Sequence, residues 1–275
     1  MSEEIKYPEL QKTAASDSEA VKRLSDIIEL LRKECPWDKV QTHQTLRKCM
    51  LEEAYEVADA IDNMDFANLR EELGDVMLQV IFHASLAAEN GNFSLKDVIN
   101  DECEKMIRRH PHIFSNEDAK NVDKVLEKWE NVKRKEKGHK TQLERLTSVP
   151  KALPALTRSY KVQARAAEVG FDWDDVSGAF SKIHEETDEL AEACRSSEKD
   201  AIAGELGDLL FSIVNVARFL DVDPEYALTL TSEKFIRRFG YIEEAADAAG
   251  LKLTDMTLAE MDKLWDEAKA KECDR

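Results

Sequence analysis

Apolar side chains along this chain recur at three- and four-residue steps, the spacing typical of helices with one buried face. In the first half this pattern predicts helices at about residues 21–33, 45–63, 66–90 and 95–109. In the second half it predicts helices at about residues 158–169, 176–195 and 199–220, and one more after Asp223 and Pro224. Because no segment shows the sustained two-residue alternation of a half-buried strand, we expect an all-α protein.

The order of these elements is repeated along the chain. All four tryptophans fall into pairs separated by 136 positions, Trp37 with Trp173 and Trp129 with Trp265. An internal repeat of about 130 residues has the size of a domain, which argues against a solenoid of short repeats. We therefore predict two tandem related helical bundles. The predicted organisation is a polar N-terminal tail at residues 1–18, domains at 19–137 and 158–275, and a proline-containing linker at 138–157.

A pattern of four carboxylates, Glu-x-x-Glu followed by Glu-x-x-Asp, occurs once in each half. The first copy consists of Glu53, Glu56, Glu72 and Asp75, and the second of Glu186, Glu189, Glu205 and Asp208. In both copies sixteen positions separate the two pairs. Residues three apart share a helix face, so each pair points two acids in one direction. Two such helices packed together would gather four like charges, which is costly unless cations lie between them.

Four carboxylates suit a hard metal ion. Mg²⁺ prefers oxygen ligands, and Mn²⁺ is the alternative. A di-iron bundle would need Glu-x-x-His pairs, and the only such spacing here, Glu136 to His139, contains Gly138. Since Mg²⁺ normally shares its coordination shell with waters and substrate phosphates, we expect a phosphorylated ligand.

Cations and aromatic residues follow each acid set. Lys234 and Arg238 follow the second set, and Lys105 and Arg109 follow the first at the corresponding spacing. Trp129 with Lys133, and Trp265 with Lys269, come next. Lysine and arginine can neutralise a polyphosphate, while tryptophan can stack on a base, although core packing is an equal alternative for both tryptophans. Trp37 and Trp173 are expected to be packing anchors.

Composition limits the classes of partner. Thirty-nine basic against 57 acidic residues give a net charge of −18, which disfavours nucleic-acid polymers and anionic membranes but leaves small phosphorylated ligands open. The five scattered cysteines favour reduced thiols, and no stretch approaches the roughly 20 apolar residues of a membrane span. We expect a cytoplasmic protein.

Taken together in this order, the motifs resemble the MazG family, tandem-domain nucleoside triphosphate pyrophosphohydrolases of the all-α NTP pyrophosphatase superfamily. The resemblance covers about residues 21–271. The motifs are the two acid sets together with Cys35-Pro36-Trp37-Asp38, Arg108-Arg109-His110-Pro111-His112, the 149–154 segment Val-Pro-Lys-Ala-Leu-Pro, the 169–173 segment Val-Gly-Phe-Asp-Trp, and Lys234-Phe235 with Arg238-Phe239.

The resemblance implies helical bundles completed by homodimerisation, and Mg²⁺-dependent hydrolysis of standard or aberrant NTPs and dNTPs to the monophosphate and pyrophosphate. The implied metal ligands are Glu186, Glu189, Glu205 and Asp208, and in the first domain Glu53, Glu56, Glu72 and Asp75. The implied nucleotide-binding residues are Lys182, Lys234, Arg238, Trp265 and Lys269. Glu185, which neighbours a metal ligand, would either orient the attacking water or lie on the surface.

The first domain departs from this pattern at one place. When the acids are aligned, Cys49 stands opposite Lys182, and Lys48 would need a shift of register to replace it. We therefore predict that the second domain carries most of the activity and that the first is weaker or structural. The alternative to an enzyme is a nucleotide-sensing or scaffold protein whose acids form solvated helix faces.

Overall fold

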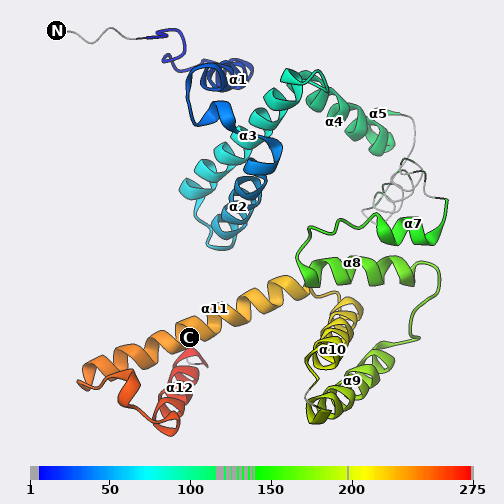
Figure 1. Ribbon diagram of the computed structural model, residues 1–275, viewed down its shortest axis with the longest axis vertical. Coiled ribbons are helices and arrows are strands. Elements are labelled where there is room, and N and C mark those ends of the chain that lie inside the picture. Colours follow the sequence, from blue (N-terminus) through cyan, green and yellow to red (C-terminus); the bar gives the residue numbers. More distant parts are fainter. Residues whose placement is uncertain are drawn as a thin grey trace. The chain divides into compact units, whose positions relative to one another are not determined.

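The computed structural model describes residues 6–115, 140–196 and 198–273, and the single positions 121, 125, 129, 132, 136 and 138 (Figure 1). Within these residues the structure consists of α-helices and short 3-10 turns and contains no β-strand, so the all-α prediction is confirmed. The chain divides into two compact units, residues 1–136 and 137–275.

In the first unit, α2 and α3 form a hairpin and α1 packs on α3. The apolar stripes of these helices meet in a core of Ile28, Leu46, Ile81, Phe82 and Leu86. The described elements of this unit are α1 (Asp17–Glu34), the 3-10 turn η1 (Asp38–Val40), α2 (His43–Asp62), α3 (Phe66–Glu89), α4 (Leu95–Arg109) and α5 (Pro111–Phe114).

Capping residues fix where the acid-bearing helices begin. The Thr42 hydroxyl accepts a hydrogen bond from the Thr45 amide while the Thr45 hydroxyl accepts one from the Thr42 amide, which forms a capping box at the start of α2. The carboxylate of Asp65 accepts hydrogen bonds from the first amides of α3. These caps set the register in which the first acid pair faces the second.

In the second unit, α9 and α10 form the hairpin and α8 packs on α10. Helix α11 packs on α8 and on α12, and Figure 1 shows the α9–α10 and α11–α12 hairpins diverging from α8. The predicted linker contains a short helix, α7, which is packed on α8. The elements are α7 (Gln142–Thr147), α8 (Ala155–Ala167), α9 (Val176–Ser196), α10 (Lys199–Phe219), α11 (Pro224–Ala248), the 3-10 turn η2 (Leu253–Asp255) and α12 (Leu258–Cys273).

None of the helices described here is both long enough and apolar enough to cross a membrane. The prediction for the early tryptophans was wrong for Trp37, whose side chain is 60% exposed. Trp173 is also 48% exposed, but one face of its ring lies against Gly178 at the start of α9.

A stacked histidine pair joins α2 to α3. The Nδ1 atoms of His43 and His83 lie 2.8 Å apart, and the rings are nearly parallel. At the corresponding positions of the second unit, 133 residues later, the chain has Val176 and Val216. The first unit therefore has two titratable residues where the second has two valines.

This pair predicts a loss of stability in acid. Burial lowers the pKa of His83, and the proximity of His43 lowers it further. As the pH falls, His83 of the unfolded chain therefore takes up a proton before His83 of the folded chain does. The stabilisation that is present above about pH 6.5 is lost as the pH falls through the lower pKa of the folded state. In urea unfolding at pH 7.5 and 5.5, the His83→Val variant is expected to lose less stability between the two pH values than the wild type. Equal losses would show that the pair makes no contribution.

Candidate metal and nucleotide site

The second acid set converges on one buried carboxylate. Oxygens of Glu186, Glu205 and Asp208 lie within 4.8 Å of one another, as do those of Glu185, Glu186 and Glu189. Glu186 belongs to both groups and is only 5% exposed. The α9–α10 hairpin produces this arrangement because each helix contributes two acids from one face.

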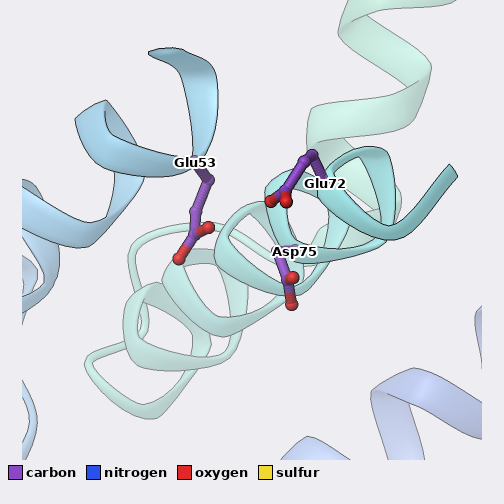
Figure 2. Close-up of side chains that lie close together, drawn as sticks. All are labelled: Glu53, Glu72 and Asp75. Carbon is purple, nitrogen blue, oxygen red and sulfur yellow. The ribbon is translucent and has the colours of Figure 1, made fainter. Parts of the chain in front are cut away.

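The first acid set converges in the same way between α2 and α3. Carboxylate oxygens of Glu53, Glu72 and Asp75 lie within 4.8 Å of one another, and Figure 2 shows that the three side chains lie close together. Glu56 lies outside this group of three but interacts with Glu53 and Glu72. The structure thus brings together all four predicted acids of each set, although the groupings differ.

Mutual repulsion in both clusters favours a bound cation. Burial raises the pKa of Glu53, and Asp75 and Glu56 raise it further. Burial likewise raises the pKa of Glu72, and the charge of Glu56 adds to this shift. In the second domain burial, then the charges of Glu186 and Glu205, raise the pKa of Glu189. Clusters of oxygen donors that repel one another fit a hard divalent ion, which would remove the repulsion.

Lys182 is paired with two carboxylates of the second cluster. Its Nζ is 2.5 Å from Glu186 and 3.0 Å from Glu185. The hydrogen bond with Glu186, followed by that with Glu185, raises the pKa of Lys182, so the side chain remains charged. Glu185 is exposed, with 55% of its side-chain surface accessible, and its carboxylate is paired with the same lysine.

Among the described residues of the first unit, no lysine is paired with the acids Glu53, Glu56, Glu72 and Asp75. Lys48 instead pairs with Glu52 at 2.8 Å, and its side chain is 82% exposed. Cys49 occupies the position that corresponds to Lys182. Lys48 therefore does not take the place in the first acid cluster that Lys182 has in the second.

The other predicted nucleotide-binding residues gather on the α11–α12 hairpin. The guanidinium carbon of Arg238 lies 5.5 Å from the centre of the Trp265 ring, and Phe235 packs 5.1 Å from the same ring. Lys269 forms an ion pair with Asp266 at 3.0 Å, and Lys234 is half-buried on the preceding helix. Trp265 is therefore half-buried against its own hairpin.

In each unit, one glutamate that the sequence analysis did not identify accepts hydrogen bonds from two neighbouring arginines. Glu272 accepts hydrogen bonds from Arg237 at 2.9 Å and from Arg238 at 2.8 Å. Glu136 makes the same pair of contacts with Arg108 and Arg109 in the first unit. The two glutamates are 136 positions apart, the spacing of the tryptophan pairs, and this signal could have identified them.

The first unit repeats the arginine–tryptophan contact. The guanidinium carbon of Arg109 lies 5.4 Å from the centre of the Trp129 ring, and His110 packs edge-on to that ring at 4.9 Å. Lys133, the predicted partner of Trp129, lies outside the described residues. The Nδ1 atom of His110 lies 2.7 Å from the Met106 carbonyl oxygen.

The α11–α12 hairpin carries Lys234, Arg238, Trp265 and Lys269 and is called the cationic hairpin below. Within one chain it is not packed on the helices α9 and α10 that carry the second acid set. Helix α11 packs on α8 and α12, and no comparable packing joins either α11 or α12 to the acid-bearing helices in the described part of the chain. Figure 1 shows the two hairpins pointing apart. The metal-binding half and the phosphate-binding half of the predicted site are therefore separate in the single chain.

The fold and site define a tandem all-α protein with a carboxylate cluster suited to a divalent ion in each domain. The MazG nucleotide pyrophosphohydrolase domain matches this chain twice, at residues 41–114 and 177–243. The chain belongs to the MazG family of nucleotide pyrophosphohydrolases.

Named relatives agree with this assignment over nearly the whole chain. The sequence is 42% identical over 259 residues to a nucleoside triphosphate pyrophosphohydrolase of Escherichia coli strain K12, with 92% of this chain and 98% of that protein covered. It is 44% identical over 248 residues to a Thermotoga maritima protein named nucleoside triphosphate pyrophosphohydrolase/pyrophosphatase MazG, with 90% and 94% covered. It is also 49% identical over 239 residues to the uncharacterized protein YabN of Bacillus subtilis strain 168, covering 86% of this chain and 49% of that protein.

Proposed function

We propose that this enzyme hydrolyses nucleoside and deoxynucleoside triphosphates to the monophosphate and pyrophosphate, that it uses Mg²⁺, and that the second domain carries most of the activity. The observation that carries the proposal is the buried Glu186, shared by two groups of carboxylates and paired with Lys182. Oxygen ligands and a fixed cation are the groups that phosphoryl transfer requires.

The chain's own residues have distinct roles in this mechanism. Glu186, Glu189, Glu205 and Asp208 would hold the ion, which when bound supplies charge stabilisation and a more acidic water. Lys182 neutralises charge on the phosphates, and Glu185, held by Lys182, orients the attacking water. The water oxygen bonds to the α-phosphorus, the bond from that phosphorus to the α,β-bridging oxygen breaks, and pyrophosphate leaves.

We further propose that a second copy of the chain completes each site. Lys234, Arg238, Trp265 and Lys269 lie on a hairpin that diverges from the acids of the same chain. Large apolar side chains of the acid helices remain open: Leu206 is 46% exposed and Leu210 is 45% exposed. A side-chain carbon added at Gly207, which lies between them in the sequence, would meet no atom within 4 Å, so this part of α10 is also uncovered. A homodimer that covers it would carry the cationic hairpin of one copy to the acids of the other.

The ligand and location proposed are consistent with the charge of the chain. A net charge of −18 disfavours nucleic-acid polymers and anionic membranes as partners, and a nucleotide would be drawn by the local cations and metal instead. The proposed location is the cytoplasm, where nucleoside triphosphates are available.

Product analysis tests the reaction directly. Purified protein incubated with each NTP and dNTP is expected to release the monophosphate and pyrophosphate in equimolar amounts with Mg²⁺, and neither product with excess chelator. Anion-exchange chromatography of the products distinguishes pyrophosphate from stepwise phosphate release. Absence of turnover with every nucleotide would favour a nucleotide-sensing or scaffold protein.

A further inference from the structure

The first unit has a pocket that none of the roles above uses. Its volume is about 650 Å³, and it lies between α1, η1, the second half of α3 and the start of α4. Ile81, Ala84 and Leu95 are among the apolar residues that line it, and none of the four acids of the first set does so. A pocket of this size is large enough for a small-molecule ligand.

The charged side chains that line this pocket are mostly basic. Four are cationic and two are anionic, so the pocket is positive although the whole chain has a net charge of −18. A local excess of positive charge attracts small anions even in an acidic protein. The basic residues are Arg32, Lys33, Lys39 and Lys96, and the acidic residues are Glu29 and Glu89.

The two acids do not neutralise all of these cations. Glu89 pairs with Arg32, whose Nη2 lies 2.6 Å from one carboxylate oxygen and whose Nε donates to the other at 2.8 Å. Glu29 is 3.9 Å from Lys33. In the part of the chain that the structure describes, Lys39 and Lys96 form no ion pair. Two ammonium groups at this pocket are therefore available to a ligand.

Two hydroxyl groups at the same pocket also lack a partner. Ser25 and Ser85 line the pocket and are half-buried, and neither side chain forms a hydrogen bond with any described residue. Other helical serines use their hydroxyls within the helix, as Ser181 does by donating to the Ser177 carbonyl oxygen at 3.0 Å. The hydroxyls of Ser25 and Ser85 can instead donate to oxygens of an anion.

The second unit has a smaller pocket in the corresponding place, and its charge is different. That pocket has a volume of about 270 Å³ and lies between α8, the end of α10 and the start of α11. Asp221 and Asp223 line it. Asp221 stands 133 residues after Ala88, and Asp223 caps α11 as Ser94 caps α4. Ala88 and Ser94 both line the pocket of the first unit, so the second unit has carboxylates where the first has uncharged groups.

Both unpaired lysines are also replaced by acids in the second unit. Lys39 follows Trp37 by two residues, and Asp175 follows Trp173 by two. Lys96 is the second residue of α4, and Glu225 is the second residue of α11. The positive charge of the pocket is therefore a property of the first unit alone and does not follow from the shared fold.

From these observations we propose that the pocket of the first unit binds a small phosphate-bearing anion, with Lys39 and Lys96 as its charge partners. Lysine binds phosphate as a compact point charge, and several lysines suit a group that carries more than one negative charge. The apolar side chains of α3 and α4 leave room for an organic part of the ligand. This proposal does not depend on the proposed function, because no residue of the candidate metal and nucleotide site lines the pocket.

Calorimetric titration of the full chain tests the site, with inorganic pyrophosphate and ribose 5-phosphate as separate probes. Excess chelator and about 0.15 M salt are present, so that no divalent ion links a probe to the acid clusters and weak surface attraction is screened. The wild type is expected to bind at one site per chain. The double variant Lys39→Asp with Lys96→Glu, which introduces the residues of the second unit, is expected to weaken binding at least about tenfold.

The matched control is Lys12→Asp with Lys48→Glu. It makes the same change in net charge at two exposed lysines of the first unit that lie outside the pocket, so binding is expected to stay within about twofold of the wild type. Circular dichroism checks the helices, and Lys39→Gln with Lys96→Gln repeats the test if the acidic variant does not fold. Tighter binding of ribose 5-phosphate would identify an organic phosphate as the ligand, and tighter binding of pyrophosphate an inorganic one. No binding of either probe by the wild type, or equal losses in the pocket and control variants, would overturn the proposal.

Discussion

The Glu189→Ala substitution is expected to lower kcat/KM for pyrophosphate release at least about 100-fold, whereas Glu56→Ala is expected to change it less than about threefold. Glu189 lies within 4.8 Å of Glu185 and Glu186, so its loss removes a ligand oxygen from the cluster that holds Lys182. Glu56 belongs to the first domain, where Lys48 pairs with Glu52 at the surface and not with the acid cluster. Steady-state kinetics with each variant at saturating Mg²⁺ measures the difference.

The matched control for this comparison is Asp188→Ala. Asp188 is the exposed neighbour of Glu189 and stands outside both groups of carboxylates, so this variant is expected to retain wild-type activity. Equal losses in Glu56→Ala and Glu189→Ala would contradict the assignment of most activity to the second domain. A loss confined to Glu56→Ala would transfer the activity to the first.

Mixing two inactive variants is expected to restore activity. Glu189→Ala removes a proposed metal ligand, and Arg238→Ala removes a cation from the α11–α12 hairpin. If the hairpin of one copy completes the acid cluster of the other, each mixed dimer contains one intact site. Random exchange of equal amounts makes half of the dimers mixed, so about one quarter of the wild-type activity should return. Activity is measured after the subunits have exchanged, and light scattering confirms the dimer.

The double variant carrying both substitutions controls for nonspecific stabilisation. Mixed with Glu189→Ala, it cannot form an intact site in either arrangement, so no activity should return. If the site were complete within one chain, neither mixture would recover activity, and the proposal that a second copy completes the site would be wrong. Circular dichroism of Arg238→Ala checks that loss of the contacts with Glu272 and Trp265 leaves the hairpin helical.

Much of the fold followed from local chemistry. Apolar spacing located the helices, and capping residues such as Asp65 and Asp223 mark where α3 and α11 begin. The wrong expectation concerned Trp37, because a large apolar residue in a turn is buried only when another element covers it, and in the described chain nothing covers most of its surface. The helix in the predicted linker was missed because a six-residue helix leaves little periodic pattern.

By itself, the sequence determined the duplication and the helical faces that carry the acids, because three-residue spacing on a helix fixes a shared direction whatever the helix packs against. Tertiary structure alone decided which oxygens of the two acid-bearing helices converge and that Lys39 and Lys96 line one pocket. It also decided that the acids and the cationic hairpin lie apart in one chain. These outcomes depend on how helices distant in sequence pack and on the rotamers that this packing permits, which local spacing does not encode.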